Sequence, residues 1–239
     1  MYLSRLILNP RHRRVQRELA RPYELHRTVL SAFGETLPPD ERVLYRVDTD
    51  ARTGQLALLV QSQHLPDWRW ADGLEGYLLF PAQTKSIELT LTPGQVLSFR
   101  LRANPTVKKA THQLDPAPTP GFIASCAAQG KKPDNGVRLG LAKEEDQRAW
   151  LARKGTQHGF RVLSLLVVPE GLQEGQQPIV SNAGAKGERN ALSHLAVRFE
   201  GLLQVADPTL LAVALRTGIG SAKGFGFGLL SLAPARVAE

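Results

Sequence analysis

The sequence has 239 residues, and its 30 lysines and arginines outnumber its 22 aspartates and glutamates, which gives a formal charge of +8. At 42% hydrophobic and 22% charged, the composition excludes a mainly disordered chain, and the length allows one large domain or two of about a hundred residues each. The single cysteine, Cys126, excludes an intramolecular disulfide and a zinc site built on cysteines, and it favours a reducing cytoplasm. No apolar run approaches the ~18–20 residues that span a bilayer, so we expect no membrane partner.

The first half of the chain alternates between strand and helix patterns. A helix over 11–20 is followed by a second over 22–32, because Pro22 suits a first helical turn, where its missing N–H costs nothing. A weak helix is expected in the irregular stretch that holds Trp68, Trp70 and Tyr77. The predicted strands are 2–8, 42–48, 56–63 and 95–103, and Asp50 to Gly54 forms a hairpin turn between the second and the third.

Prolines and glycines mark residues 105–136 as a linker or large loop. Beyond it, a helix is predicted over 142–158, with an acidic first turn and Gly159 at its end. A second helix over 208–215 begins with Asp207 as its N-cap and Pro208 in its first position. The predicted strands of this half are 137–141, 160–168, 192–203 and 225–232.

Each half therefore has the order βαββαβ, which predicts an α+β protein with two tandem ferredoxin-like domains of RRM-like topology. We place the N-terminal domain at 1–105, a linker or insertion at 106–136 and the C-terminal domain at 137–239. In this fold each sheet carries helices on one face. RNA-binding modules of the same topology use the open face to meet single strands.

Positive charge is concentrated in three clusters. The N-terminal cluster, residues 1–27, holds seven arginines and two glutamates, a balance of +5. Clustered arginine favours a phosphate-bearing partner, because its planar fork suits phosphate, although a solvated helix face has the same composition. The candidate phosphate ligands are Arg21 and Arg27, then Arg100, Arg102, Lys108 and Lys109, then Lys186 and Arg189.

Tyr23 and His26 form the first candidate reactive group. They are three residues apart on the predicted helix and so share a face near its N-terminus, where free N–H groups attract phosphate. The same field disfavours the imidazolium and would help to keep His26 available as a base. The plainer alternative is that Tyr23 packs on the core and His26 is a surface histidine.

The second candidate is a glycine-rich loop with five glycines and Lys223 between Gly218 and Gly228. Glycines let a backbone approach phosphate closely, and the RNA-binding candidates here are Gly218, Gly220, Lys223, Gly224 and Gly226. The pattern is neither a Rossmann fingerprint nor a Walker A loop. A tight structural turn would explain two or three of the glycines. The six histidines have no metal-ligand spacing, and we expect no metal or other cofactor.

Four segments together resemble the CasE family, the CRISPR RNA-processing endoribonucleases of type I-E Cascade complexes. These segments are Tyr2–Pro10, Arg21–Arg27, Phe99–Pro105 and Gly218–Ser231, in collinear order along nearly the whole chain. The resemblance implies a tandem ferredoxin-like fold. It places Tyr23 and His26 on the family's catalytic positions and Lys223 with its neighbouring glycines on its glycine-rich loop. The family's basic hairpin would fall near Lys186 and Arg189.

The resemblance also implies the reaction. Such an enzyme cuts CRISPR repeat RNA at the 3′ base of a stem-loop without a metal, and it retains the product within Cascade. The 2′-hydroxyl attacks the adjacent phosphate and leaves a 2′,3′-cyclic phosphate and a 5′-hydroxyl. His26 would serve as general base or general acid, with Tyr23 as its orienting or proton-donating partner.

Two alternatives remain open at this stage. A non-catalytic RNA-binding subunit of a ribonucleoprotein would use the same basic clusters and glycine-rich loop without a reactive pair. A metal-free phosphoesterase acting on small cyclic nucleotides would fit His26-Arg27-Thr28, one copy of a His-x-Thr element that such enzymes need twice.

Overall fold

The computed structural model describes residues 1–50, 52–109, 137–178 and 189–235. Its helices are α1 (Arg13–Ala20), α2 (Pro22–Leu30), α3 (Arg69–Asp72), α5 (Glu144–Gln157) and α6 (Pro208–Thr217), with short 3₁₀ helices η1 (Ser31–Phe33) and η4 (Lys223–Phe225). Its strands are β1 (Tyr2–Leu8), β2 (Leu44–Thr49), β3 (Leu56–Ser62), β4 (Gln83–Ser86), β5 (Val96–Ala103), β6 (Thr106–Lys109), β7 (Val137–Gly140), β8 (Phe160–Pro178), β9 (Arg189–Val205) and β10 (Leu230–Pro234).

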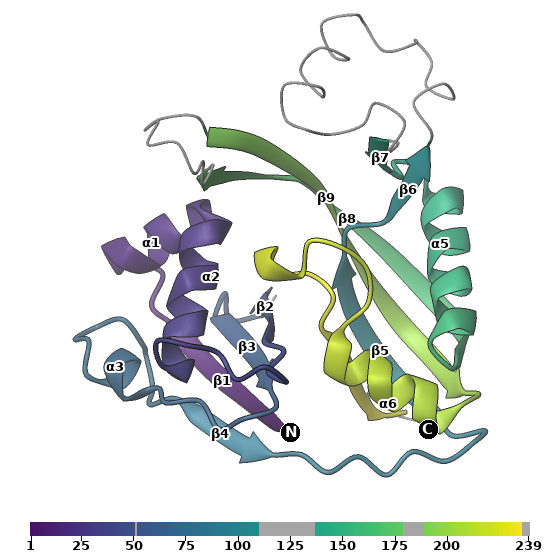
Figure 1. Ribbon diagram of the computed structural model, residues 1–239, viewed down its shortest axis with the longest axis horizontal. Helices are drawn as coiled ribbons and strands as arrows, with labels where there is room; N and C mark the ends of the chain where they lie inside the picture. The colour runs from purple at the N-terminus through teal and green to yellow at the C-terminus, as the bar shows by residue number, and fades with distance from the viewer. Residues whose placement is uncertain (51, 110–136, 179–188, 236–239) are drawn as a thin grey trace, which may run out of the picture.

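Two antiparallel four-stranded sheets organise the chain, with strand orders β2-β3-β1-β4 and β10-β5-β9-β8 (Figure 1). In the first sheet β1 lies between β3 and β4, and in the second sheet β5 lies between β9 and β10. The first strand of each unit is thus flanked by its third and fourth strands, which is the order of a βαββαβ unit. The predicted α+β fold with two tandem ferredoxin-like units is therefore confirmed.

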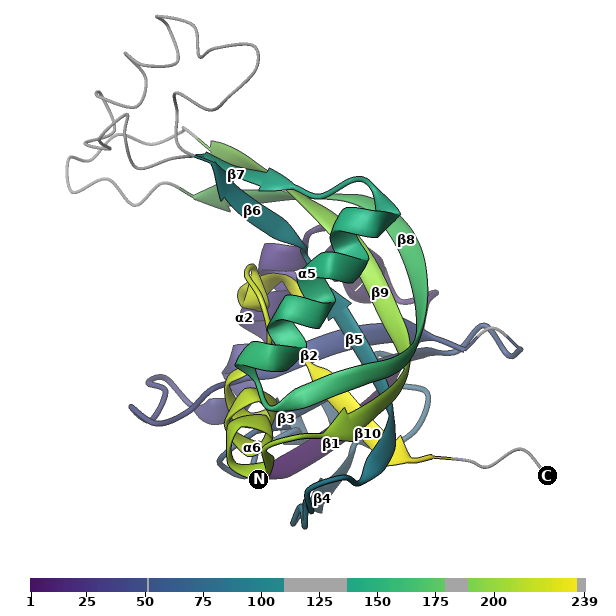
Figure 2. The same ribbon diagram turned by 90° about the vertical axis from the view of Figure 1, so that its right-hand side faces the viewer.

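Each unit has its own hydrophobic core. In the first, Leu25 and Val29 of α2 pack with Leu58 and Val60 of β3. In the second, α5, which lies along the second sheet in Figure 2, contributes Trp150, stacked on Phe199 of β9 with ring centroids 5.8 Å apart. Burial of one helix face on one sheet face stabilises each unit separately.

The pairing of β5 corrects the predicted arrangement of the sheets. The segment 95–103 forms the expected alternating strand, but β5 pairs with β9 and β10 in the second sheet, although the prediction put residues up to 105 in the first domain. The first sheet is completed by β4 instead, which pairs with β1 and joins it through a 2.9 Å hydrogen bond between Ser4 and Thr84. All four residues of β4 are exposed and polar, so the strand carries no apolar alternation for sequence analysis to detect.

Three further strands differ from their predicted places or lengths. The segment 137–141 does form a strand, but β7 pairs with β6 in a separate two-stranded sheet rather than opening the second unit. Strands β8 and β9 pair as far as Pro178 and Arg189, well beyond the predicted ends, because the ladder of backbone hydrogen bonds continues past the apolar stretches that the prediction is based on. The last strand begins at Leu230, not at 225, because Gly226 and Gly228 have positive φ values (81° and 89°) that a strand does not accommodate.

Candidate active site

Helix α2 carries the two candidate catalytic residues. Its Pro22 stands at the first helical position, as predicted, and Leu25 and Val29 face the core. Tyr23 and His26 lie on the flank of the helix, and both are half-buried. Because they are three residues apart on a regular helix, their side chains are neighbours on one face.

A buried carboxylate holds α2 in place. Glu18 of α1 is 2% exposed and accepts hydrogen bonds from the Thr28 hydroxyl (2.6 Å), the Tyr77 hydroxyl (2.6 Å) and Arg14 Nε (2.7 Å). Thr28 belongs to α2, so this network fixes the two helices against each other. It thereby sets the position of the helix that carries His26.

The imidazole of His26 is enclosed by residues distant in sequence. A Cβ placed on Gly224 would lie 3.4 Å from both Cε1 and Nε2 of the ring, so the glycine-rich loop rests directly on His26. The ring of Tyr45 stacks on the imidazole with centroids 6.1 Å apart, and the Tyr45 hydroxyl donates to the Gly224 carbonyl at 2.8 Å. No hydrogen-bond partner for the buried Nδ1 of His26 occurs among the described residues.

This enclosure keeps His26 neutral. Burial lowers the pKa of His26, and the nearby cation Arg42 lowers it further. The direction agrees with the sequence prediction of an uncharged imidazole, and burial and Arg42 act in the direction expected of the helix N-terminus. A neutral imidazole can accept a proton from a hydroxyl group.

The glycines of the loop have two different roles. Gly218, Gly220, Gly226 and Gly228 have positive φ values that other residues adopt only with strain. A Cβ on Gly218 would also lie 2.8 Å from Leu44, so this glycine permits close packing of the second unit on the first. The structural-turn interpretation therefore accounts for these four.

Gly224 is different. Its φ is not in the left-handed region, and a Cβ there would lie in van der Waals contact with the His26 ring, which leaves no room beyond it in that direction. The preceding residue, Lys223, donates from Nζ to the Thr217 carbonyl at 2.6 Å, and burial followed by Arg42 and Lys154 lowers its pKa. The loop thus places Lys223 next in sequence to the glycine that touches His26, with its ammonium group on the Thr217 carbonyl.

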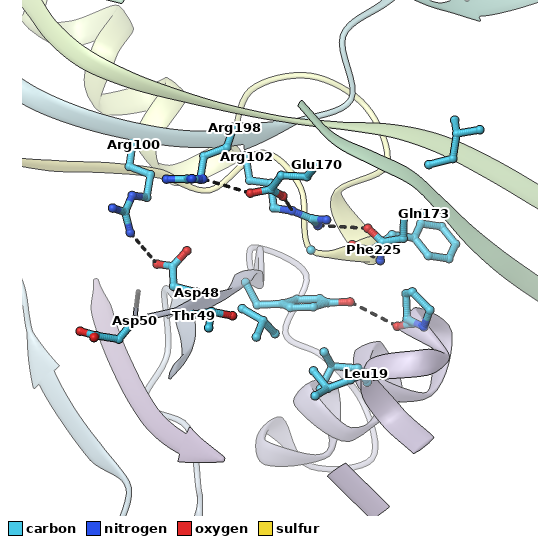
Figure 3. A pocket seen from close by; sticks show the side chains of 16 residues that line it. Leu19, Asp48, Thr49, Asp50, Arg100, Arg102, Glu170, Gln173, Arg198 and Phe225 are labelled. Atoms are coloured by element: carbon cyan, nitrogen blue, oxygen red, sulfur yellow. Dashed lines mark hydrogen bonds and ion pairs between the residues drawn. The ribbon is translucent and has the colours of Figure 1, made fainter. Parts of the chain in front are cut away.

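A separate cleft of about 650 Å³ lies between the two sheets (Figure 3). In it, Arg100 Nε lies 2.6 Å from Glu200, and Arg100 Nη1 lies 3.6 Å from Asp48 on the first sheet. Arg102 Nε lies 2.6 Å from Glu170. Figure 3 shows the two side chains pointing toward each other. Arg100 and Arg102, both predicted as phosphate ligands, therefore form ion pairs with the protein's own carboxylates.

This cleft is not the place where Tyr23 and His26 lie. Its lining includes Tyr45 and Gly226 but neither of the two candidates on α2. Arg46, which is 2% exposed, crosses from β2 and donates to Asp48, to the Ser231 hydroxyl and to the Leu229 carbonyl. The Arg46 hydrogen bonds and the ion pair of Arg100 with Asp48 join the two open sheet faces. Tyr23 and His26 lie outside this cleft, and His26 is beside the glycine-rich loop.

The remaining predicted ligands are scattered. Arg21 is exposed and pairs with Glu24 at 3.0 Å, while Arg27 is exposed on α2 next to His26. Lys108 and Lys109 are exposed on β6. Lys186 lies outside the described residues, and for Arg189 only the strand position is described.

Sequence reasoning missed Tyr45 and Arg42. Tyr45 occupies a strand of core residues, where an aromatic is unremarkable, and Arg42 is one of thirty basic residues. Tyr45 stacks on His26, and Arg42 lowers the pKa of His26, only because β2 packs against η4 in the folded chain. No group of three or more potential metal-ligating side chains occurs in the part of the chain that the structure describes, and no helix there is long and apolar enough to cross a membrane.

Fold and site define a class: a protein of two ferredoxin-like units whose glycine-rich loop covers a neutral histidine among cations. The sequence model of the family described as CRISPR associated protein matches residues 1–234, and the chain belongs to this family. It is 36% identical over 238 residues to the CRISPR-associated endoribonuclease Cse3 of Thermus thermophilus, covering 98% of this chain and all of that protein.

Two further similarities extend the comparison. The Cascade subunit CasE of Escherichia coli K12 is 31% identical over 236 residues, with 98% of this chain and all of that protein covered. The structure of Thermus thermophilus Cse3 bound to an RNA that represents a pre-cleavage complex superposes with a TM-score of 0.71 at 34% identity, covering 98% of each chain. The family resemblance seen in the sequence is thus confirmed.

Proposed function

We propose that this protein is an endoribonuclease that processes CRISPR transcripts. It cuts the repeat RNA at the 3′ base of its stem-loop and retains the cut product. The family membership, the relative named as an endoribonuclease and the solved pre-cleavage RNA complex of Cse3 support this proposal. The observation that carries it is the half-buried imidazole of His26, which lies against Gly224 and has a pKa lowered by burial and by Arg42.

The reaction needs little from the protein beyond alignment and proton transfer. The 2′-hydroxyl of the scissile nucleotide is already adjacent to its phosphorus, so in-line attack is intramolecular and requires no bound water. The bond from phosphorus to the 5′-oxygen breaks as the bond to the 2′-oxygen forms. The products are a 2′,3′-cyclic phosphate and a 5′-hydroxyl. His26 takes the proton from the 2′-oxygen or gives one to the leaving 5′-oxygen.

The surrounding groups have supporting roles. Tyr23, on the same face of α2, orients the RNA or donates a proton. Arg27, Arg42 and Lys223 stabilise the charge that develops on the phosphate oxygens. Because this scheme needs no Lewis acid, we propose that the enzyme works without a metal ion.

The expected partners follow from the relatives. The CasE relative is named as a Cascade subunit, which supports assembly of this chain with other Cascade subunits around the retained RNA. Transcripts are made in the cytoplasm, and we place the protein there. The basic N-terminal cluster and the glycine-rich loop would contact the RNA, in keeping with the charge of +8.

A cleavage assay with the repeat RNA from the source organism's CRISPR array tests the proposal. We expect one cut in the presence of EDTA, a 2′,3′-cyclic phosphate on the upstream product, and no cut when the scissile nucleotide carries a 2′-deoxy sugar. Binding of the RNA without cleavage would support a non-catalytic subunit instead. Turnover of small cyclic nucleotides without RNA binding would support a phosphoesterase.

A further inference from the structure

A second cavity adjoins the glycine-rich loop, and of its lining residues only Lys223 has a role in the reaction proposed above. It has a volume of about 310 Å³ and is lined by the loop, by α5 and by the β6–β7 sheet. Lys223 lines this cavity, and the next residue, Gly224, touches His26. The cavity, called the α5 cavity below, therefore shares one loop with the candidate active site.

The α5 cavity is built from cations and hydroxyl groups. Arg138, Lys154, His158 and Lys223 supply its charged or ionisable groups. Hydroxyl groups come from Thr106, Thr217 and Ser221, and no carboxylate is among the described residues that line the cavity. The Nζ atom of Lys154 donates a hydrogen bond to the side-chain oxygen of Gln157 at 2.8 Å. Because this amide is uncharged, the hydrogen bond does not neutralise the lysine.

The cations crowd one another. Burial lowers the pKa of Lys154, and Arg153 and Arg138 lower it further. Burial also lowers the pKa of His158, with added contributions from Lys154 and Lys223. A solvated surface would let such like charges separate. Here α5 and the loop hold them around one space, where a bound anion would relieve their repulsion.

We propose that the α5 cavity binds a backbone phosphate of the single-stranded RNA that flanks the repeat stem-loop. The proposal rests on the proposed function, which supplies the RNA. A strand that passes His26 along the glycine-rich loop meets this cavity at the adjacent residue, so one loop would guide the scissile phosphate and a neighbouring phosphate together. A phosphate group accepts hydrogen bonds from ammonium, guanidinium and hydroxyl groups alike, and the cavity presents all three.

The experiment compares the binding of flanked and trimmed RNA. The repeat stem-loop is prepared with both single-stranded flanks, with either flank alone and with none, each carrying a 2′-deoxy scissile nucleotide so that it stays intact. The variant Lys154→Gln/His158→Asn removes two of the cavity's ionisable groups. The matched control is Arg153→Gln, which removes one charge from an exposed residue of the same helix that does not line the cavity. Lys154→Arg keeps the charge.

We expect the wild-type protein to bind a flanked RNA more tightly than the trimmed stem-loop. In the double variant this preference falls by about tenfold, and the salt dependence of binding the flanked RNA falls by about one phosphate contact. Arg153→Gln and Lys154→Arg keep the wild-type preference. Inorganic phosphate competes with the flank in the wild-type protein and not in the double variant.

The inference is overturned if the double variant melts at the wild-type temperature and keeps the full preference for flanked RNA. It is also overturned if inorganic phosphate occupies the cavity but the flanks add nothing to affinity, since the cavity would then hold only a free anion. If the double variant does not fold, Lys154→Gln alone is measured against Arg153→Gln. Absence of cleavage by the wild-type protein would contradict the proposed function and leave these binding measurements unaffected.

Discussion

Gly224 of the second unit rests on the imidazole of His26 of the first, with the position of its absent Cβ only 3.4 Å from Nε2. This contact joins η4 and α2, whose sequences are about two hundred residues apart. It closes one side of the imidazole and leaves the ring neutral. The contact yields a direct test of the site.

Enlarging Gly224 should displace His26. A Cβ at 3.4 Å would be in van der Waals contact with the ring, so Gly224→Ala should keep most of the cleavage rate. Gly224→Leu places further atoms in the space of the ring and should lower the rate by at least about tenfold. Single-turnover cleavage measures the effect, and thermal melting of both variants controls for folding. Full activity of Gly224→Leu would contradict the placement of the loop on His26.

Removal of the His26 imidazole should abolish proton transfer while RNA binding persists. We expect His26→Ala to lower the cleavage rate by ~10²–10⁴-fold, the usual contribution of a general acid or base, with little change in affinity. His64→Ala is the matched control, because His64 is an exposed histidine paired with Glu41. Wild-type cleavage by His26→Ala would exclude His26 from the reaction.

The pH dependence of the rate distinguishes the two roles of His26. Burial and Arg42 lower its pKa, so the neutral form prevails at pH 7. A general base then gives a rate that falls only below about pH 6.5, the ordinary histidine value. A general acid gives a rate that falls as the pH rises through the same range. Tyr23→Phe, measured over the same profile, tests proton donation by the phenol.

Loss of the Tyr45 hydroxyl should loosen the junction of the two units. Tyr45 is 1% exposed, and its hydroxyl donates a hydrogen bond to the Gly224 carbonyl. Tyr45→Phe leaves that carbonyl without this donor and should reduce the free energy of unfolding by about 1–2 kcal/mol. Urea unfolding measures this loss, and cleavage should also slow because Gly224 is no longer held over His26. An unchanged urea midpoint would show that the hydrogen bond contributes nothing.

The buried Glu18 should be far more important to stability than its exposed neighbour Glu24. Glu18→Ala leaves the hydroxyl groups of Thr28 and Tyr77 without their acceptor, and we expect a loss of about 3 kcal/mol or more. Glu24→Ala, which breaks exposed ion pairs with Arg17 and Arg21, should cost about 1 kcal/mol or less. Urea unfolding of both variants checks the difference, and equal losses would contradict the role given to the buried network.

Stability should decline in mild acid. Burial lowers the pKa of His26, His158 and His194 in the folded protein, whereas histidines of the unfolded chain titrate near 6.5. Below that value the unfolded chain binds more protons than the folded one, so the free energy of unfolding falls as the pH drops from 7.5 to 5.5. Urea midpoints at the two values measure the decline, and His158→Asn should reduce it. A midpoint that rises in acid would contradict the predicted direction.

The sequence by itself determined the local elements, including the helix that carries the two candidate catalytic residues. Pro22, Asp207 and the alternation over 95–103 act within a few residues, and each produced the helix start or strand that it predicts. Local steric and capping effects are encoded in neighbouring residues, so they can be recognised without a fold.

Only the tertiary structure decided which segments meet. β5 pairs with β9 in the second sheet rather than with strands of the first domain, and the polar β4 pairs with β1 instead. Strand pairing depends on partners far along the chain, so the local pattern does not reveal it. The same packing engaged Arg100 and Arg102 with carboxylates and laid Gly224 on His26. A charged residue is equally visible in the sequence whether it is free or paired, since its partner is chosen by folding.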